Sequence, residues 1–187
     1  MDRLLPFDEL NTLHPIVNDI MQREDREQFY DYLCDEIEDI LILSYMFGNE
    51  AGNTALDENV KIDRDELEDS IFKVIAGEKW PERIKNHLEN GTAEEIIRVA
   101  TTEAHRVYNE AAFYVALSVD YPVWKVWECM MLPTSRDTHI YLEGQKQLLN
   151  DPFFTFDGDF AMHPGEFLLP ENNVNCLCRI RLTKEPF

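Results

Sequence analysis

The sequence has few cysteines and no long run of apolar residues. Its four cysteines, at positions 34, 129, 176 and 178, lack the spacing typical of a secreted disulfide framework, so we expect reduced thiols in a cytosolic setting. The longest apolar run, residues 40–47, is far shorter than the roughly 18 residues that a membrane span needs. No basic and apolar leader opens the sequence. These absences argue against membrane and disulfide-rich secreted classes.

Basic residues are also scarce. The chain has 17 Lys and Arg against 37 Asp and Glu, which gives a formal net charge of −20 at pH 7. Most of this excess lies in the first hundred residues. Because an acidic surface repels phosphate backbones, we expect no general nucleic-acid binding. The acids either keep helices soluble or attract a basic protein partner.

The first half of the chain has helical patterning. Residues 15–47 place apolar side chains at a period near 3.6, with acids on the other faces, which predicts one long helix or two. We expect the Gly- and Asn-rich segment 47–62 to interrupt this helical pattern. Further helices are expected over 63–76 and 79–91. A capping box, Thr92 with Glu95, then opens the longest predicted helix, 92–118.

The rest of the chain, residues 121–182, has strand patterning. It is rich in β-branched and aromatic residues, with Pro, Gly, Asp and Asn recurring every few positions. We expect strands over 123–131, 152–156, 159–162 and 174–182, and we expect Phe154, Phe156 and Phe160 to be core residues. The predicted fold class is α+β, a helical N-terminal half followed by a small antiparallel β-rich C-terminal half. We divide the chain into an acidic helical region, 1–76, and a second region, 77–187.

Several motifs occur in order within the second region. They are TTEAHRVYNEAA (101–112), WECMMLPTSRDTHIYLEGQ (127–145), the Pro-Phe, Asp-Gly and Pro-Gly elements of NDPFFTFDGDFAMHPGEF (150–167), and NVNCLC (173–178). Together they resemble the head-morphogenesis, or minor capsid, proteins of tailed phages, which share a Mu F-like domain. The resemblance covers roughly residues 77–182. One departure is Leu177, which stands where the family usually has Arg.

The resemblance implies a structural role. It suggests a phage or prophage protein, present in a few copies, that is associated with the portal or with capsid or scaffold protein. It also implies a location in the host cytoplasm during assembly and in the interior of the virion head afterwards. The amphipathic segment 16–47 would either pack fully on the rest of the chain or present part of its apolar stripe to such a partner.

The helix motif carries polar residues whose role is open. One interpretation is a buried network that docks the helix onto the sheet. It would consist of Glu103, Arg106, Asn109, Arg136 and His139. The alternative is an acid–base site of a nuclease or transferase-like enzyme. It would use Glu103, His105, Arg106 and His139.

The closing cysteine pair also allows several readings. In some relatives of the family, Cys-x-x-Cys stands where this chain has residues 136–139, and a histidine precedes the final cysteines, which suits tetrahedral zinc. Here His139, Cys176 and Cys178, with His163 as a fourth ligand, would form the site of a zinc-stabilised binding module.

Two other readings of the pair need no metal. Cys176 and Cys178 share one strand face with Ile180 and Leu182, so they could be ordinary core residues. The remaining interpretation is a Cys–His nucleophile, in which Cys176 acts with His139 and with Asn175 or Asp137.

Overall fold

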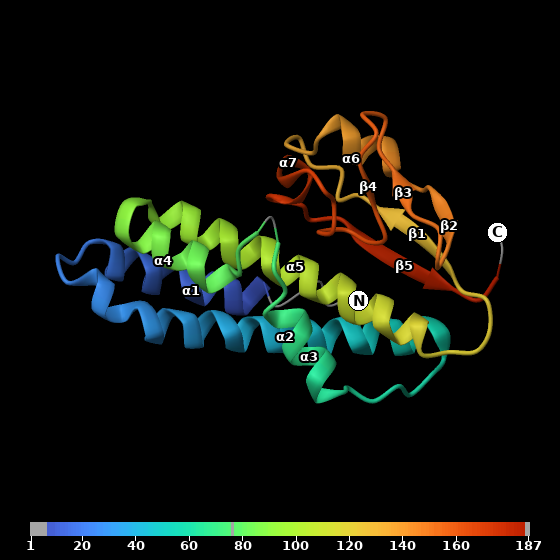
Figure 1. The fold of residues 1–187 in the computed structure, drawn as a ribbon, viewed down its shortest axis with the longest axis horizontal. Coiled ribbons are helices and arrows are strands. Elements are labelled where there is room, and N and C mark those ends of the chain that lie inside the picture. The colour runs from blue at the N-terminus through green and yellow to red at the C-terminus, as the bar shows by residue number, and fades with distance from the viewer. Residues whose placement is uncertain (1–6, 76, 186–187) are drawn as a thin grey trace.

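The computed structural model describes residues 7–75 and 77–185 and has α+β architecture (Figure 1), which confirms the predicted fold class. The helical part comes first in the chain. It contains α1 (Phe7–Met21), the 3-10 helix η1 (Arg26–Phe29), α2 (Tyr30–Leu56), α3 (Arg64–Ile71), α4 (Trp80–Asn90) and α5 (Ala93–Leu117). The β-rich part follows. It contains β1 (Trp124–Glu128), α6 (Asp137–Leu142), β2 (Lys146–Leu148), β3 (Phe153–Phe154), β4 (Phe160–Ala161), α7 (Pro170–Asn173) and β5 (Arg179–Thr183).

The β-rich part contains two small antiparallel sheets. One has the strand order β2-β1-β5 and the other is the β3–β4 hairpin. In the first sheet, Trp127 lies opposite Ile180 and Glu128 opposite Arg179. The β-rich part sits over the C-terminal half of α5, while α1 and α4 lie against its N-terminal half (Figure 1). Helix α5 therefore connects the two halves of the protein.

Helices α2 and α5 lie side by side and run in the same direction (Figure 1). The helix does end within the predicted segment 47–62, but later than the glycines suggest, because α2 continues to Leu56 and ends at Asp57, whose φ of 49° is left-handed. The two glycines of this segment act in packing. A Cβ on Gly48 would lie 2.1 Å from the carbonyl oxygen of Tyr108, and one on Gly52 would lie 2.9 Å from the Cβ of Val115.

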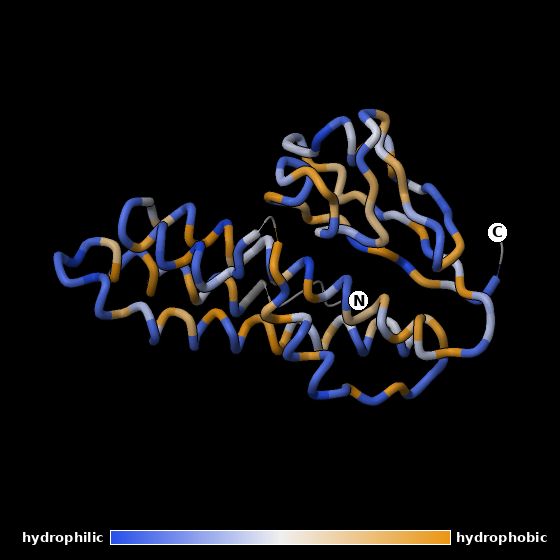
Figure 2. Tube along the Cα trace, viewed as in Figure 1, coloured by the Kyte–Doolittle hydropathy of each residue, from blue (hydrophilic) through white to orange (hydrophobic). Residues whose placement is uncertain are grey.

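The buried apolar side chains form two clusters. The first lies among the helices and holds the apolar stripe of α2, including Leu33, Ile37 and Leu41, each 0% exposed. The second lies between the C-terminal half of α5 and the β-rich part, around Trp127. Figure 2 shows the matching pattern, with hydrophobic and hydrophilic stretches alternating along the helices. The first cluster contains residues from both sides of position 76, and the division at that position stays a prediction.

The aromatic residues of the β3–β4 hairpin differ from expectation. Phe154, Phe156 and Phe160 are 53%, 60% and 41% exposed, so the prediction that they are core residues is wrong. The reason is strand alternation: Phe153 is the inward residue of β3 and is fully buried, edge-on to Trp127 at 5.2 Å between ring centroids. Its neighbour Phe154 therefore points outward. Sequence patterning also missed α6, β2 and α7.

A buried carboxylate orders the segment that leads to the closing cysteines. Asp159, 4% exposed, accepts hydrogen bonds from the backbone nitrogens of Leu168 and Leu169, both at 3.1 Å, and from the side-chain amide of Asn172 at 2.8 Å. Because an aspartate accepts several donors at once, one side chain fixes this whole turn. This turn determines the position of α7 and of the residues that follow it.

Candidate functional site

Two polar residues of α5 hold the segment that contains Cys176 and Cys178. The side-chain amide of Asn109 donates to the carbonyl of Cys178 at 3.0 Å, and its oxygen accepts from the nitrogen of Ile180 at 2.9 Å. About two helical turns earlier, the hydroxyl of Thr102 accepts from the nitrogen of Asn175 at 3.1 Å. The backbone groups inside a helix already bond to one another, so only side chains can pair with the backbone of a neighbouring segment. Asn109 and Thr102 of the helix motif do this for residues 175–180.

The charged residues of the same motif face the other helices. The guanidinium of Arg106 donates to the carboxylate of Glu103 at 2.8 Å, to that of Glu110 at 2.5 Å and to the carbonyl of Ser70 at 2.7 Å. Glu103 also accepts from Arg83 at 2.5 Å. Arg106 and Glu103 are each 1% exposed. Every one of these buried charges is therefore paired, as burial requires.

The Pro-Gly element packs directly onto this arginine. Gly165 has a φ of +90°, and a Cβ there would lie 2.8 Å from the Cβ of Arg106. Only glycine combines that backbone conformation with so close an approach. Two motifs that are far apart in the sequence thus meet at one point.

The single network expected from the sequence is instead divided into separate sets. Arg136 lies away from Glu103 and donates to the carbonyl of Val174, and His139 lies with the cysteines. The physical reason is that Arg83 and Arg106 already satisfy the carboxylate of Glu103. Sequence reasoning missed Arg83, although it lies in a predicted helix with Glu82 as its neighbour in the first turn.

The four residues of the enzyme alternative do not line a common open surface. Glu103, Arg106, His105 and His139 are all buried, at 1%, 1%, 4% and 3% exposure. Burial lowers the pKa of His105 to about 4, so its imidazole is neutral at pH 7. Glu103 is held by two guanidinium groups. This arrangement suits support of the fold better than proton transfer to a substrate.

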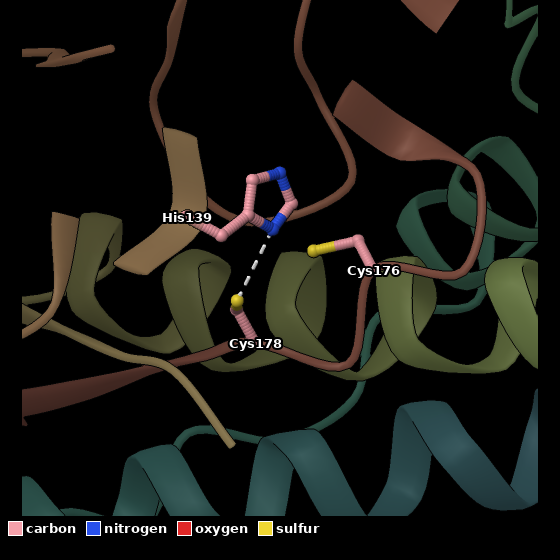
Figure 3. A group of neighbouring side chains, drawn as sticks. All are labelled: His139, Cys176 and Cys178. Carbon is pink, nitrogen blue, oxygen red and sulfur yellow. Dashed lines mark hydrogen bonds between the residues drawn. The ribbon is translucent and has the colours of Figure 1, made fainter. Parts of the chain in front are cut away.

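The closing cysteines and the histidine of α6 form a compact buried cluster (Figure 3). One ligand atom from each of His139, Cys176 and Cys178 lies within 4.8 Å of the other two, and each residue is 3% exposed. Nδ1 of His139 is 3.4 Å from the sulfur of Cys178. A hydrogen bond from Cys178 lowers the pKa of Cys176, while that contact and burial raise the pKa of Cys178.

The fourth expected ligand lies elsewhere. His163 packs against Phe113, with its Nδ1 3.1 Å from the carbonyl of Pro164 and its Nε2 3.5 Å from the carboxylate of Glu166. It is absent from the group that surrounds His139. The prediction that His163 is a ligand is therefore wrong. The turn at Pro164 directs its ring toward α5 and Glu166, and the sequence pattern of the strands gave no sign of this.

The chemistry of the cluster favours metal binding over nucleophilic catalysis. A nucleophilic cysteine needs an accessible thiolate in a positive environment, whereas both thiols here belong to the second apolar cluster. Two thiolates and an imidazole are the ligands that zinc prefers. Core packing and metal binding do not exclude each other at this position.

A pocket of about 610 Å³ adjoins the cluster. It lies between α1, the N-terminal half of α5 and the loop after β1. Its lining includes polar and charged side chains that could contact a polar ligand, among them His14, Arg98, Thr101, Ser135 and Arg136. His139, Cys129 and Cys178 line it too, so the pocket borders one side of the cluster.

A buried lysine lies on strand β1, apart from the polar residues of α5 and from the cluster of His139 with the cysteines. Lys125 is 0% exposed, and its ammonium donates to the carbonyl of Met162 at 2.7 Å. It also lies 5.1 Å from the ring centroids of Phe113 and Phe153. Aromatic faces and one carbonyl replace only part of the water that a charged lysine loses.

This environment predicts a distinctive dependence of stability on pH. Burial lowers the pKa of Lys125 from 10.5 to about 8, although Glu166 and Asp151 oppose the shift. The unfolded chain therefore binds more protons than the folded one between pH 8 and 10.5, so this group makes folding more favourable as pH rises through that range. Relative to Lys125→Met, the wild type should gain about 2 kcal/mol of unfolding free energy between pH 7 and pH 10.

Urea unfolding at several pH values measures this effect. Lys85→Met, a change at an exposed position of α4, is the control and should show no such trend relative to wild type. If the unfolding free energies of wild type and Lys125→Met change in parallel with pH, the prediction is wrong. The ammonium would then be as well solvated in the folded protein as in the unfolded chain.

Comparisons with protein-family models, curated proteins and solved structures find no significant match to this chain. The resemblance to Mu F-like proteins thus rests on the quoted motifs alone. None of the helices in the described part of the chain is long and apolar enough to cross a membrane.

Proposed function

We propose that this protein is a structural component of tailed-phage head assembly, as its resemblance to Mu F-like minor capsid proteins suggests. In this proposal it binds a portal, capsid or scaffold protein in the host cytoplasm and remains in the head interior. It performs no reaction. Its motifs serve to hold the β-rich part on helix α5 in a fixed position.

One observation carries the proposal: the motifs contact one another. Asn109 of the helix motif binds the backbone of the closing NVNCLC motif and of the residues after it. Arg106 of the same motif lies under Gly165 of the Pro-Gly element. Trp127 lies edge-on to His139, at 6.0 Å between ring centroids. Motif residues that hold one another in position are expected in a structural domain.

The acidic face of α2 is the surface best suited to a partner. Most of its apolar stripe is packed inside the protein, and acids predominate on the face that the first half of α2 presents outward. Asp31, Asp35 and Asp39 recur every four residues and are exposed. Burial, together with Asp35, Asp39 and Glu68, raises the pKa of Glu38, as expected where negative charges crowd. Such a face favours a basic partner and fast, salt-sensitive association.

Co-expression with the portal protein of the same phage tests the proposal. We expect the two proteins to elute together from a size-exclusion column at low salt and to separate as the salt concentration rises. The triple variant Asp31→Asn, Asp35→Asn, Asp39→Asn should bind at least tenfold more weakly, because three charges are lost from the contact face.

The matched control neutralises three exposed acids elsewhere. They are Asp120, Glu171 and Glu185. This control should bind like wild type. Equal loss in both triple variants would assign the effect to net charge instead of to α2. Separate elution of portal, capsid and scaffold proteins from this chain at every salt concentration would contradict the proposal.

A further inference from the structure

A third cysteine lies beside the His139 cluster. Strands β1 and β5 are antiparallel, and their register pairs Trp127 with Ile180 and Glu128 with Arg179. Continuing this register by one position brings Cys129 opposite Cys178. Side chains on the same face of directly opposite residues have Cβ atoms about 4.5–5.5 Å apart. Cys129 and Cys178 are therefore cross-strand neighbours.

The side chains bear out this placement. Cys129 packs against the same apolar cluster as the other two cysteines and lines the pocket beside His139. All three cysteines are free thiols in the structure.

We propose that Cys129, His139, Cys176 and Cys178 are the four ligands of a tetrahedral zinc site. In such a site the ligand atoms lie roughly 3.5–4 Å apart, given zinc–ligand bonds of about 2.0–2.3 Å. The 3.4 Å between His139 and Cys178, and the 4.8 Å limit within the group of three, are close to that geometry. Cys129 lies outside this group of three, so it would complete the site through a movement of the residues that follow β1.

The surroundings fit a zinc ion held by three thiolates. Such a centre carries a net charge of −1, and Arg136, which donates to the carbonyl of Val174, lines the same pocket as His139 and Cys178. His139 is fixed between the rings of Trp127 and Phe167, with its Nδ1 toward the sulfurs (Figure 3). The Nε2 of His139 is buried and has no hydrogen-bond partner among the described residues. Because Nδ1 is the nitrogen directed at the sulfur of Cys178, it is the atom that would offer its lone pair to the metal.

The zinc site would link three segments that contain little regular secondary structure. Cys129 follows β1, His139 belongs to the six-residue helix α6, and the cysteine pair precedes β5. Since all four positions are protein ligands, the metal would be structural and not catalytic. This inference goes beyond the proposed role in phage heads and does not depend on it, because metal content is measured on the isolated protein.

Metal analysis and cobalt substitution test the assignment. Protein purified without chelator from zinc-supplemented cells should contain one zinc per chain. Replacement with Co²⁺ should give the intense visible bands of a tetrahedral ion and the near-ultraviolet bands of thiolate ligation. A strong chelator should lower the melting temperature.

Single variants identify the ligands. Cys129→Ser should weaken Co²⁺ binding more than about 100-fold and reduce the thiolate band, whereas Cys34→Ser, a change at a half-buried cysteine of α2, should match wild type. The wild-type spectrum keeps the test valid if a variant fails to fold. Absence of zinc and of Co²⁺ binding, a Cys129–Cys178 disulfide in freshly purified protein, or unchanged affinity in Cys129→Ser would overturn the four-ligand site.

Discussion

Replacing Arg106 by methionine should destabilise the protein by about 3–5 kcal/mol, because it removes one partner from a buried ionic network. The arginine joins Glu103, Glu110 and the carbonyl of Ser70, and it is 1% exposed. After the change, Glu103 keeps only Arg83, and the Ser70 carbonyl loses the hydrogen bond from the guanidinium. The free energy of unfolding in urea at pH 7 measures the loss.

A matched control lies on the same helix. Arg98 is exposed and pairs with Glu95 at 3.5 Å, so Arg98→Met should change stability by less than about 1 kcal/mol. In addition, the loss in a double variant with Glu103→Gln should be smaller than the sum of the single losses, since the uncompensated charge is then absent. Equal effects of Arg106→Met and Arg98→Met would contradict the structural role given to the helix motif.

The second large effect is expected at Gly48. Gly48→Ala should destabilise the protein by about 3 kcal/mol, because the new methyl group would lie 2.1 Å from the carbonyl oxygen of Tyr108 and 3.0 Å from the Cβ of Ala111. The obstacle is backbone, so no rotamer change relieves it, and α2 must move away from α5. In a free helix the same substitution would be stabilising by roughly 0.5–1 kcal/mol.

Thermal unfolding followed by circular dichroism measures this loss. Thr54→Ala, at an exposed position of the same helix, is the control and should differ from wild type by less than about 0.5 kcal/mol. A stabilised Gly48→Ala protein would mean that the two helices are farther apart than the structure has them.

Local sequence signals predicted the long helix well. Thr92 and Glu95 form the expected capping box, and α5 runs from Ala93 to Leu117. This prediction succeeds because the capping box and the helical period of the apolar residues both lie within one continuous segment of the sequence. The same is true of the change to strands after residue 121, where patterning alone indicated the β-rich part.

Tertiary packing accounts for what the sequence could not predict. Glycine predicts a helix end when it is read locally, yet Gly48 and Gly52 sit inside α2 because α5 approaches there. Cys129 could be added to the ligand candidates only once the β1–β5 register was known, since 47 positions separate it from Cys176 in the sequence. His163 had the right chemistry for a ligand, but the turn at Pro164 directs it elsewhere.

Quantitative mass spectrometry of gradient-purified phage heads tests the central claim most directly. Heads from the strain that encodes this chain should contain its peptides in a constant ratio to the portal protein, a few copies per head, both before and after DNA packaging. Heads and proheads without the protein, purified under conditions that retain the portal, would contradict a role as a structural component of the head.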